Sequence, residues 1–331
     1  MTKTVMVLGS NSFAGSDFID LLLGATDYQV IGVNRSPEKE AFFLPYLQNA
    51  QLSHFTFYQI DLNKEMESLK ELLAEVRPAY VINFAAQGEV ATSWQYPEQW
   101  FQTNAVATAM LSNYLRDQKW LQRYVHISTP EVYGTCEGRV TEDSPLNPST
   151  PYAASKAAGD LMLFTLTKAF NFPLVMIRAT NYYGPHQQLY RIIPRTIIFL
   201  KLHRKIELHG GGKAVKSYIH IRDVSRGELL AMEKGQRGSI YHLSPDSPIA
   251  IRDLVAQICA LMGRSLHAST VSVADRLGQD KAYIIDSTKA RAELGWRPRI
   301  SMEEGLAEVI KWAEQNWAEI QQQPLNYEHK A

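Results

Sequence analysis

The residue types best suited to chemistry lie in two nearby stretches of the chain, HISTPEVYG and PYAASK. In the second stretch, Tyr152 and Lys156 stand four residues apart at the start of a helical pattern, so they share one helix face. An ammonium near a phenol favours the phenolate, which predicts a lowered tyrosine pKa and proton exchange near neutral pH. In the first stretch, Thr129 could hold the same substrate oxygen, and Glu131 supplies a carboxylate. Together these groups could deprotonate a hydroxyl while hydride leaves its carbon for a nicotinamide.

A Tyr-x-x-x-Lys spacing also occurs by chance on protein surfaces, so the elements that position the pair decide how it is interpreted. The apolar, β-branched run from Tyr124 to Ile127 predicts a buried parallel strand. That strand would deliver Ser128, Thr129 and Glu131 to its carboxyl end. Open α/β sheets bind ligands at that edge, which favours catalysis over coincidence.

The amino-terminal segment has the pattern of a dinucleotide site. An apolar strand from Thr4 to Leu8 runs into a glycine turn, and an apolar helical run from Phe18 to Leu23 follows. Glycines let the backbone approach a pyrophosphate, which sits on the helix amino terminus. Serine replaces the middle glycine of the expected G-x-x-G-x-x-G pattern, so an ordinary strand-to-helix turn is the alternative. The residues expected to bind the cofactor here are Gly9, Asn11, Ser12, Phe13, Ala14 and Gly15.

Three further strands predict the rest of the cofactor site. The strand from Tyr28 to Val33 ends without the carboxylate that would grip the adenosine ribose of NAD. An asparagine beside an arginine and a serine could accept a 2′-phosphate, which favours NADP over NAD, although Arg35 could be a solvated loop cation. Strands at 55–60 and 80–86 would bring an aspartate and small side chains to the same edge. Tyr152 and Lys156 are also expected to contact the cofactor. The strand ends add Asn34, Arg35, Ser36, Asp61, Leu62, Phe84, Ala85, Ala86 and Gln87 to the expected cofactor site.

The alternation of strands and helices predicts the fold. Strand-length apolar runs alternate with amphipathic helical stretches such as 65–76, which implies right-handed crossovers and a doubly wound parallel sheet. We therefore expect an α/β fold with a Rossmann-type sheet and a smaller, mostly helical substrate-binding lobe. Residues 1–182 with about 217–245 should form the dinucleotide-binding domain, and 183–216 with about 246–331 the interleaved second lobe.

The composition narrows the classes of partner. The 331 residues include 34 basic and 34 acidic side chains, which gives no electrostatic case for nucleic acid or an anionic membrane. No apolar run is long enough to span a bilayer, and the amino-terminal run is too short for a secretory signal, so we expect a cytoplasmic protein. The two cysteines, Cys136 and Cys259, are far apart without a histidine cluster, so neither a disulfide framework nor a metal site is expected.

Taken in order, these motifs resemble the extended short-chain dehydrogenase/reductases over nearly the whole chain. The resemblance is carried by the glycine turn, the Ala-Ala-Gln edge, Tyr-x-x-x-Lys and two later segments, RATNYYGP and LGWRPRISMEEGL. Within that superfamily, HISTPEVYG is closest to the HISTDEVYG stretch of nucleotide-sugar 4,6-dehydratases. The resemblance implies an NDP-hexose 4,6-dehydratase, a lyase that forms a 4-keto-6-deoxy nucleotide sugar.

The resemblance also implies a role for each catalytic residue. Tyr152, helped by Lys156 and Thr129, takes the proton from the carbon-4 hydroxyl as hydride passes to NAD or NADP. The new ketone acidifies the carbon-5 hydrogen, Glu131 removes it, and water leaves from carbon 6. Hydride then returns to carbon 6, so the cofactor is regenerated and should stay tightly bound. A carboxylate base favours a dehydratase over a 4-epimerase, because epimerisation through a 4-ketone needs no such base.

Pro130 departs from the dTDP-glucose type of dehydratase, in which an aspartate at this place resembles the acid that protonates the departing hydroxyl. Proline has no proton to give, so either Glu131 carries the proton itself or another group or a water does. GDP-mannose dehydratases also lack that aspartate, carry a glutamine like Gln87 and tend to use NADP. The sequence resembles that branch more, although the segment from Trp94 to Trp100 follows neither branch closely.

The family pattern further points to a substrate site and an oligomer. Cations and amides suit a sugar diphosphate, although most basic residues are simply surface charges. A homodimer is expected through the helices near 106–115 and 152–170. The residues expected to bind the nucleotide sugar are Gln87, Glu89, Ser93, Trp94, Glu131, Asn181, Arg191, Lys216 and Arg222.

Other functions stay open from the sequence alone. A nucleotide-sugar 5,6-dehydratase performs the same oxidation and elimination but returns hydride to carbon 4. A 4-epimerase or a decarboxylating nucleotide-sugar enzyme stands further away. A non-catalytic cofactor-sensing protein on the same fold would need the glycine turn but not the tyrosine and lysine, and the joint presence of all four catalytic residues argues against it.

Overall fold

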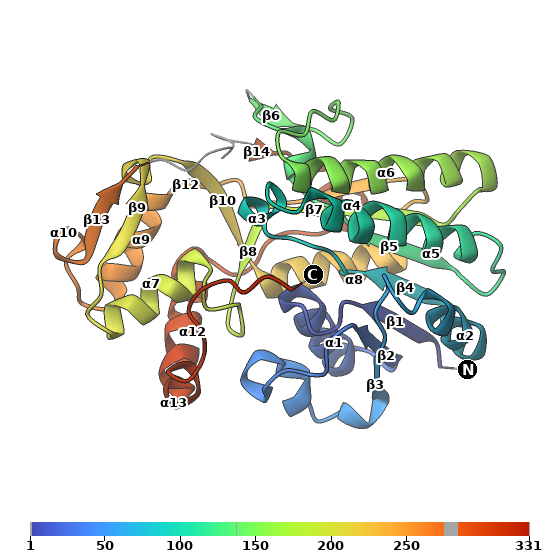
Figure 1. Cartoon of the computed structure of the whole chain (residues 1–331), viewed down its shortest axis with the longest axis horizontal. Helices are drawn as coiled ribbons and strands as arrows, with labels where there is room; N and C mark the ends of the chain where they lie inside the picture. The colour runs from blue at the N-terminus through green and yellow to red at the C-terminus, as the bar shows by residue number, and fades with distance from the viewer. Residues whose placement is uncertain (1, 137, 275–283, 331) are drawn as a thin grey trace.

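Seven parallel strands form the central sheet of the protein, seen in a computed structural model that describes residues 2–136, 138–274 and 284–330. The strands follow the order β11-β7-β5-β4-β1-β2-β3, and every neighbouring pair is parallel (Figure 1). The predicted doubly wound sheet is therefore confirmed. The strands are β1 (Thr4–Leu8), β2 (Gln29–Asn34), β3 (Phe55–Gln59), β4 (Tyr80–Asn83), β5 (Arg123–Ile127), β7 (Leu174–Ala179) and β11 (Ile240–Leu243).

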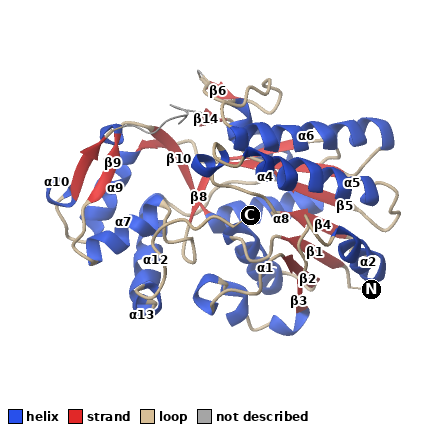
Figure 2. Ribbon diagram, in the orientation of Figure 1, coloured by secondary structure: helices blue, strands red, loops and turns tan. Residues whose placement is uncertain are grey.

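Helices cover both faces of this sheet (Figure 2). α1 and α8 pack on one face, and α2, α5 and α6 pack on the other. Strand β1 shows why neither face is polar, because Val5 and Val7 enter one core cluster while Met6 and Leu8 enter the other. The helices are α1 (Phe13–Ala25), α2 (Met66–Val76), α5 (Thr108–Leu115), α6 (Pro151–Phe170) and α8 (Ile221–Lys234).

A second group of helices and short strands lies beside one end of the sheet (Figure 1). Apolar side chains of α7, α9 and α12, among them Leu254 and Leu306, form its core. Outside the central sheet, the short strands pair as β12-β10-β8, β13-β9 and β14-β6. The remaining elements are α3 (Val90–Ser93), α4 (Pro97–Phe101), β6 (Arg139–Val140), β8 (Asn181–Tyr183), α7 (Ile192–Lys201), β9 (Ile206–His209), β10 (Val215–His220), β12 (Pro248–Ala250), α9 (Ile251–Leu261), α10 (Leu266–Ser269), β13 (Thr270–Val273), β14 (Ile284–Ile285), α11 (Thr288–Leu294), α12 (Met302–Gln315) and α13 (Trp317–Ile320).

Two elements beside the central sheet have ends that local contacts explain. Helix α7 carries Pro194 in its first turn, where the missing N–H has no intrahelical partner to lose. Strand β10 pairs with β8 and β12 rather than joining the central sheet. It ends at His220, which caps α8 by accepting a hydrogen bond from the Arg222 amide.

The division of the chain into two interleaved lobes stays a prediction. That division assigns α11 to the second lobe, yet the helix packs against elements of the dinucleotide-binding domain. Ala290 and Leu294 of this helix lie in the core cluster of α1 and α8, as does Trp296. Trp296 Nε1 donates a hydrogen bond of 2.8 Å to the Asp223 carbonyl of α8. The segment around α11 therefore packs on the side of the central sheet.

The described residues contain neither a membrane-spanning helix nor a metal-binding cluster. Among residues 2–136, 138–274 and 284–330, no helix combines the length and the apolar character that crossing a membrane requires. Within the same residues, no group of three or more His, Cys, Asp or Glu side chains could hold a metal ion. Cys259 is a buried free thiol, and Cys136 Sγ donates a hydrogen bond of 3.3 Å to the Tyr133 carbonyl.

Candidate active site

Two elements bring the predicted catalytic residues together at the carboxyl end of β5. After β5, Thr129 caps the short 3₁₀ helix Pro130–Tyr133, and its Oγ1 accepts a hydrogen bond from the Glu131 amide (N···O 3.3 Å). Helix α6 starts at Pro151 and presents Tyr152 in its first turn. The Tyr152 hydroxyl is hydrogen-bonded to Thr129 and lies within the field of Glu131. The structure therefore places threonine, glutamate and tyrosine in one cluster.

The Tyr152 phenol is not acidified in this structure, contrary to the expectation from the Tyr-x-x-x-Lys spacing. Burial raises the pKa of Tyr152 above its usual value, and the negative charge of Glu131 raises it further. The hydrogen bond with Thr129 and the charge of Arg191 lower the pKa without reversing the shift. At neutral pH the phenol therefore carries its proton.

Lys156 is buried one helical turn after Tyr152 and binds the edge of the sheet. Its Nζ donates a hydrogen bond of 2.8 Å to the Ile127 carbonyl at the end of β5. Burial lowers the pKa of Lys156 to about 8, although the Asp160 carboxylate opposes this shift. The ammonium thus ties α6 to β5, and this attachment fixes the height of Tyr152 above the sheet.

A network of buried polar side chains lies behind Lys156 and is centred on Asp160. The Asp160 carboxylate is fully buried and accepts hydrogen bonds from Ser128 Oγ (2.6 Å) and Arg178 Nη2 (2.8 Å). His126 Nε2 lies 3.6 Å from the other carboxylate oxygen, and burial holds the pKa of His126 well below its usual value. Sequence reasoning missed Asp160, although this residue continues the four-residue spacing of the catalytic pair along α6.

The network extends from Arg178 to strand β11. Arg178 donates to the Tyr133 hydroxyl, which is hydrogen-bonded to His242 Nε2 over 2.7 Å. Burial, reinforced by the charge of Arg178, lowers the pKa of His242 to about 3, so this imidazole is neutral. Burial raises the pKa of Tyr133 to about 12, so the phenol is neutral as well. The guanidinium charge of Arg178 is therefore balanced by Asp160.

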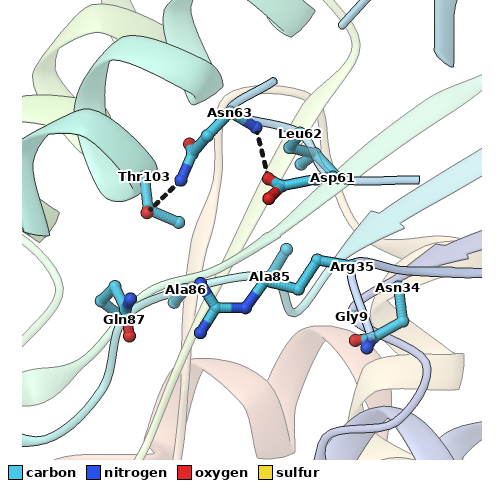
Figure 3. Close-up of a pocket in the computed structure, with 10 residues that line it drawn as sticks. All are labelled: Gly9, Asn34, Arg35, Asp61, Leu62, Asn63, Ala85, Ala86, Gln87 and Thr103. Atoms are coloured by element: carbon cyan, nitrogen blue, oxygen red, sulfur yellow. Dashed lines mark hydrogen bonds between the residues drawn. The ribbon is translucent and has the colours of Figure 1, made fainter. Parts of the chain in front are cut away.

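An open pocket lies where β1, β2 and β4 end (Figure 3). Sequence reasoning missed two of its lining residues, Asn63 and Thr103. Asn63 Nδ2 donates a hydrogen bond of 2.9 Å to Thr103 Oγ1, and the Asn63 backbone amide donates a hydrogen bond of 2.9 Å to Asp61 Oδ1. Thr103 is distant in sequence, so no local pattern points to it. The other lining residues were all expected to bind the cofactor: Gly9, Asn34, Arg35, Asp61, Leu62, Ala85, Ala86 and Gln87.

The glycine turn holds the backbone against the sheet beside this pocket. Gly9 has a φ of 81°, and a Cβ there would lie 2.7 Å from the Ala85 amide nitrogen. A Cβ at Gly15 would lie 2.4 Å from the Gly9 carbonyl oxygen. Ser12, at the place of the middle glycine, is the N-cap of α1, and its Oγ accepts a hydrogen bond of 3.0 Å from the Gly15 amide. The serine therefore supports the helix start that a pyrophosphate would approach.

Several other residues expected to bind the cofactor also make contacts within the protein. Asn11 Nδ2 donates to the carbonyls of Ser36 (3.1 Å) and Pro37 (2.8 Å), which fixes the loop after β2. Three apolar residues of the expected site have side chains in the core cluster of α1. These are Phe13, Ala14 and Phe84.

Three of the expected substrate residues lie beside the catalytic cluster. Arg191 Nη1 lies 3.7 Å from Glu89 Oε2, and the charges of both Glu89 and Tyr152 act on the Arg191 guanidinium. Ser93 Oγ accepts a hydrogen bond of 3.2 Å from the Tyr152 amide. The Arg191 guanidinium thus acts on the catalytic phenol, while Ser93 holds the start of the helix that carries it.

The remaining expected substrate residues lie on other elements, and Arg222 and Gln87 have partners within the protein. Arg222 Nη2 is 2.7 Å from Asp20 Oδ2 and 3.1 Å from Asp17 Oδ1, both on α1. These two carboxylates neutralise the charge that a sugar diphosphate would need, so Arg222 joins α8 to α1. Gln87 Nε2 donates to the Lys330 carbonyl. Trp94 is exposed, Asn181 lies in β8 and Lys216 lies in β10.

Comparison with known proteins identifies the family. The family model of GDP-mannose 4,6 dehydratase matches residues 6–309. The chain belongs to this family. Among its relatives, the dTDP-glucose 4,6-dehydratase of Streptomyces antibioticus is 31% identical over 97% of this chain and 96% of its own. The dTDP-glucose 4,6-dehydratase of Streptomyces niveus is 30% identical over 95% of this chain and 94% of its own.

Solved structures of a dehydratase and an epimerase share the fold of this GDP-mannose 4,6 dehydratase family member. The dTDP-glucose 4,6-dehydratase of Streptomyces venezuelae, determined with NAD bound, has a TM-score of 0.87 and 31% identity over 95% of this chain and 98% of its own. The UDP-glucuronic acid 4-epimerase of Bacillus cereus has a TM-score of 0.85 and 26% identity over 94% of this chain and 99% of its own. The predicted Rossmann-type fold and the extended short-chain dehydrogenase/reductase resemblance are therefore confirmed.

Removing the carboxylate at the centre of the buried network should destabilise the protein. Asp160→Asn leaves the buried Arg178 guanidinium without its counter-charge, so the free energy of unfolding should fall by about 3–5 kcal/mol. Glu67→Gln, which breaks the exposed ion pair with Lys70, is the matched control and should cost less than about 1 kcal/mol. Denaturant titration measures both variants. An Asp160→Asn protein as stable as the wild type would contradict the buried ion pair.

Proposed function

We propose that this chain is an NAD(P)-dependent nucleotide-sugar 4,6-dehydratase, which converts an NDP-hexose into a 4-keto-6-deoxy nucleotide sugar. The observation that carries the proposal is the cluster of Thr129, Glu131 and Tyr152 at the carboxyl end of β5. It joins an acid–base pair for oxidation to a carboxylate for elimination. Membership of the GDP-mannose 4,6 dehydratase family and the dTDP-glucose 4,6-dehydratase relatives support this class of reaction.

The first step of the proposed reaction is oxidation at carbon 4 of the hexose. When bound, the nicotinamide cofactor accepts hydride from carbon 4 and later returns it to carbon 6. Once substrate and cofactor complete the site and the phenol has lost its own proton, Tyr152 takes the proton of the carbon-4 hydroxyl. Thr129, already hydrogen-bonded to Tyr152, holds the same oxygen. Lys156 keeps this end of α6 on the sheet through the Ile127 carbonyl.

Glu131 performs the second step. The carbon-4 ketone acidifies the hydrogen on carbon 5, and Glu131 removes that proton as the hydroxyl leaves carbon 6. Pro130 is buried and has no proton for the departing group, so Glu131 passes on the proton it has taken and water is released. Once hydride has returned to carbon 6, the proton that Tyr152 took from the carbon-4 hydroxyl replaces the proton that carbon 5 lost. The side chains are then restored for the next turnover.

The proposed cofactor is NADP, held tightly because it is regenerated in each turnover. Asn34 and Arg35 line the pocket at the end of β2, which carries no carboxylate to grip an unmodified ribose. The solved dehydratase from Streptomyces venezuelae has NAD bound, which supports the wider class of nicotinamide dinucleotide. The preference for a 2′-phosphate is the proposed part.

We also propose that the chain is divided into two lobes and that the protein is cytoplasmic. The core cluster of α7, α9 and α12 is separate from the two clusters that cover the central sheet, which supports a distinct substrate lobe. The location rests on the sequence alone. The substrate is an NDP-hexose whose base and sugar are left to experiment.

A homodimer through α5 and α6 is also part of the proposal. The two helices pack side by side. Large apolar side chains stay exposed on them and on the π-helical turn Gln102–Ala107 before α5, and such groups mark interaction surfaces. These are Val106 (44% exposed), Met110 (43%), Leu161 (57%) and Phe170 (50%).

Incubation with GDP-, UDP-, CDP- and dTDP-hexoses, each with NAD or NADP, tests the activity. At least one sugar nucleotide should lose the mass of one water and gain the methyl signal of a 6-deoxy sugar in NMR spectra, faster with NADP than with NAD. Loss of water with an exocyclic alkene would instead indicate a 5,6-dehydratase. An isomer of unchanged mass would indicate a 4-epimerase. If no sugar nucleotide is consumed, the proposed function is wrong.

Glu131→Gln should separate oxidation from elimination. Without a carboxylate base, water loss should slow by about 10²–10⁴-fold, while reduced nicotinamide accumulates and is seen by its near-ultraviolet absorbance. Tyr152→Phe is the companion variant and should show neither water loss nor reduced nicotinamide. Unchanged turnover in Tyr152→Phe would favour the non-catalytic cofactor-sensing alternative.

Leu161→Glu should break the proposed dimer, because it places a charge in an apolar contact between two copies of α6. Sedimentation equilibrium should show a dimer for the wild type and a monomer for this variant. Leu261→Glu, at an exposed leucine (41%) on α9, is the control and should stay dimeric. A monomeric wild type would contradict the dimer.

A further inference from the structure

The carboxyl-terminal segment, residues 321–330, returns from α13 across the protein and ends near the middle of the molecule (Figure 1). We refer to it as the strap. Its side chains alternate between half-buried and exposed positions, which is typical of an extended segment that lies with one face on a surface. The half-buried side chains are Gln323, Leu325, Tyr327 and His329, and the exposed ones are Pro324, Asn326, Glu328 and Lys330.

The first half of the strap is attached to the second lobe. Arg195 Nη1 donates to the Leu325 carbonyl (3.2 Å) and to Asn326 Oδ1 (3.3 Å). The Tyr327 ring meets the Tyr190 ring edge-on, with 5.4 Å between the ring centroids. Tyr190 precedes the arginine that lies beside the catalytic phenol, so the strap passes next to the proposed sugar site.

The second half of the strap is attached to the dinucleotide side. The His329 ring lies nearly parallel to the rings of Tyr96 and Trp100, with centroid distances of 5.3 and 5.2 Å. His329 Nε2 is 2.7 Å from Gln99 Oε1. These aromatic and polar contacts fix the strap on α4 and the residue before it. The same strap is therefore attached to both sides of the site.

The strap ends on two residues that line the cofactor pocket. The Lys330 carbonyl accepts hydrogen bonds from Gln87 Nε2 (2.8 Å) and Arg35 Nη2 (3.0 Å). Arg35 reaches across the pocket towards Gln87 (Figure 3). These residues follow β4 and β2, on either side of β1 in the sheet. One backbone carbonyl thus joins the segment after β2 to the segment after β4.

The strap lies beside the pocket rather than inside it. It is held by Arg35 and Gln87, which line the pocket together with Gly9, Asp61 and Ala85, so the space between them stays open with the strap in place. Leu325 packs against the core cluster of α7, α9 and α12. Beyond it, residues 326–330 are held by hydrogen bonds and ring contacts, so this part of the strap can detach without opening that core. Such a segment can open for a cofactor to enter and close behind it.

We propose that residues 323–330 belong to the cofactor site and hold the dinucleotide in place between turnovers, by joining Arg35 and Gln87 through the Lys330 carbonyl and by stacking His329 on α4. The inference rests on the proposed function, because an enzyme that regenerates its cofactor gains by not releasing it. Nothing in the chemistry at Tyr152 requires the strap.

Cofactor release measures this role without a sugar nucleotide. Protein is loaded with labelled NADP or labelled NAD and then mixed with an excess of the same unlabelled dinucleotide. The rate at which the protein loses its label is the dissociation rate of the cofactor. His329→Ala removes the stacking and should speed release by about tenfold or more, as should deletion of residues 323–331. His329→Phe keeps an aromatic ring and should release the cofactor at nearly the wild-type rate. Glu328→Ala, on the exposed face of the strap, should match the wild type.

The outcomes are distinct. Unchanged release from His329→Ala and from the deletion variant, both with wild-type circular dichroism, would overturn the proposal. Slower release or tighter binding after deletion would also overturn it, since the strap would then compete with the cofactor. If the deletion variant does not fold, the comparison of His329→Ala with Glu328→Ala decides. If His329→Ala releases the cofactor faster but the wild type consumes no sugar nucleotide, the role of the strap stands and the proposed dehydratase function is wrong. A wild type that binds no dinucleotide would reject both.

Discussion

The site depends on one buried carboxylate. Asp160 is fully buried, and it balances the guanidinium of Arg178 at 2.8 Å while it also favours the charged form of Lys156. Buried charges are stable only when they are paired and hydrogen-bonded, so this arrangement holds together the elements that carry the partners. Through Ser128 it fixes the end of β5, and through Arg178 it fixes β7. Tyr152 stands two turns earlier on the same helix and takes its position from this anchor.

The electrostatics of the free protein keep the catalytic phenol neutral. Tyr152 is buried and faces Glu131, and both conditions raise its pKa. Lys156, which was expected to lower that pKa, donates to the Ile127 carbonyl instead. A neutral phenol can hydrogen-bond to a sugar hydroxyl but cannot remove its proton. Proton transfer in the proposed reaction therefore depends on how substrate and cofactor change the field around Tyr152 when they complete the site.

The relatives of the chain and its local chemistry carry different information. The match to the GDP-mannose 4,6 dehydratase family and the likeness to dTDP-glucose 4,6-dehydratases extend over nearly the whole chain and define the fold and the class of chemistry. The solved 4-epimerase has the same fold, so the fold does not select the reaction. That selection rests on Glu131, and Pro130 beside it makes the glutamate responsible for both proton removal and proton delivery in our proposal.

The sequence by itself determined the parts of this protein that are local along the chain. The strand and glycine turn that end in Gly9, and the four-residue spacing of Tyr152 and Lys156, follow from backbone geometry and periodicity. Only the tertiary structure decided which distant groups meet. It paired Arg222 with two carboxylates of α1, brought Thr103 to Asn63, and laid Lys330 against Arg35. Local patterns encode how each segment folds, whereas these contacts depend on how packed elements bury their apolar faces, and no short window of sequence contains that information.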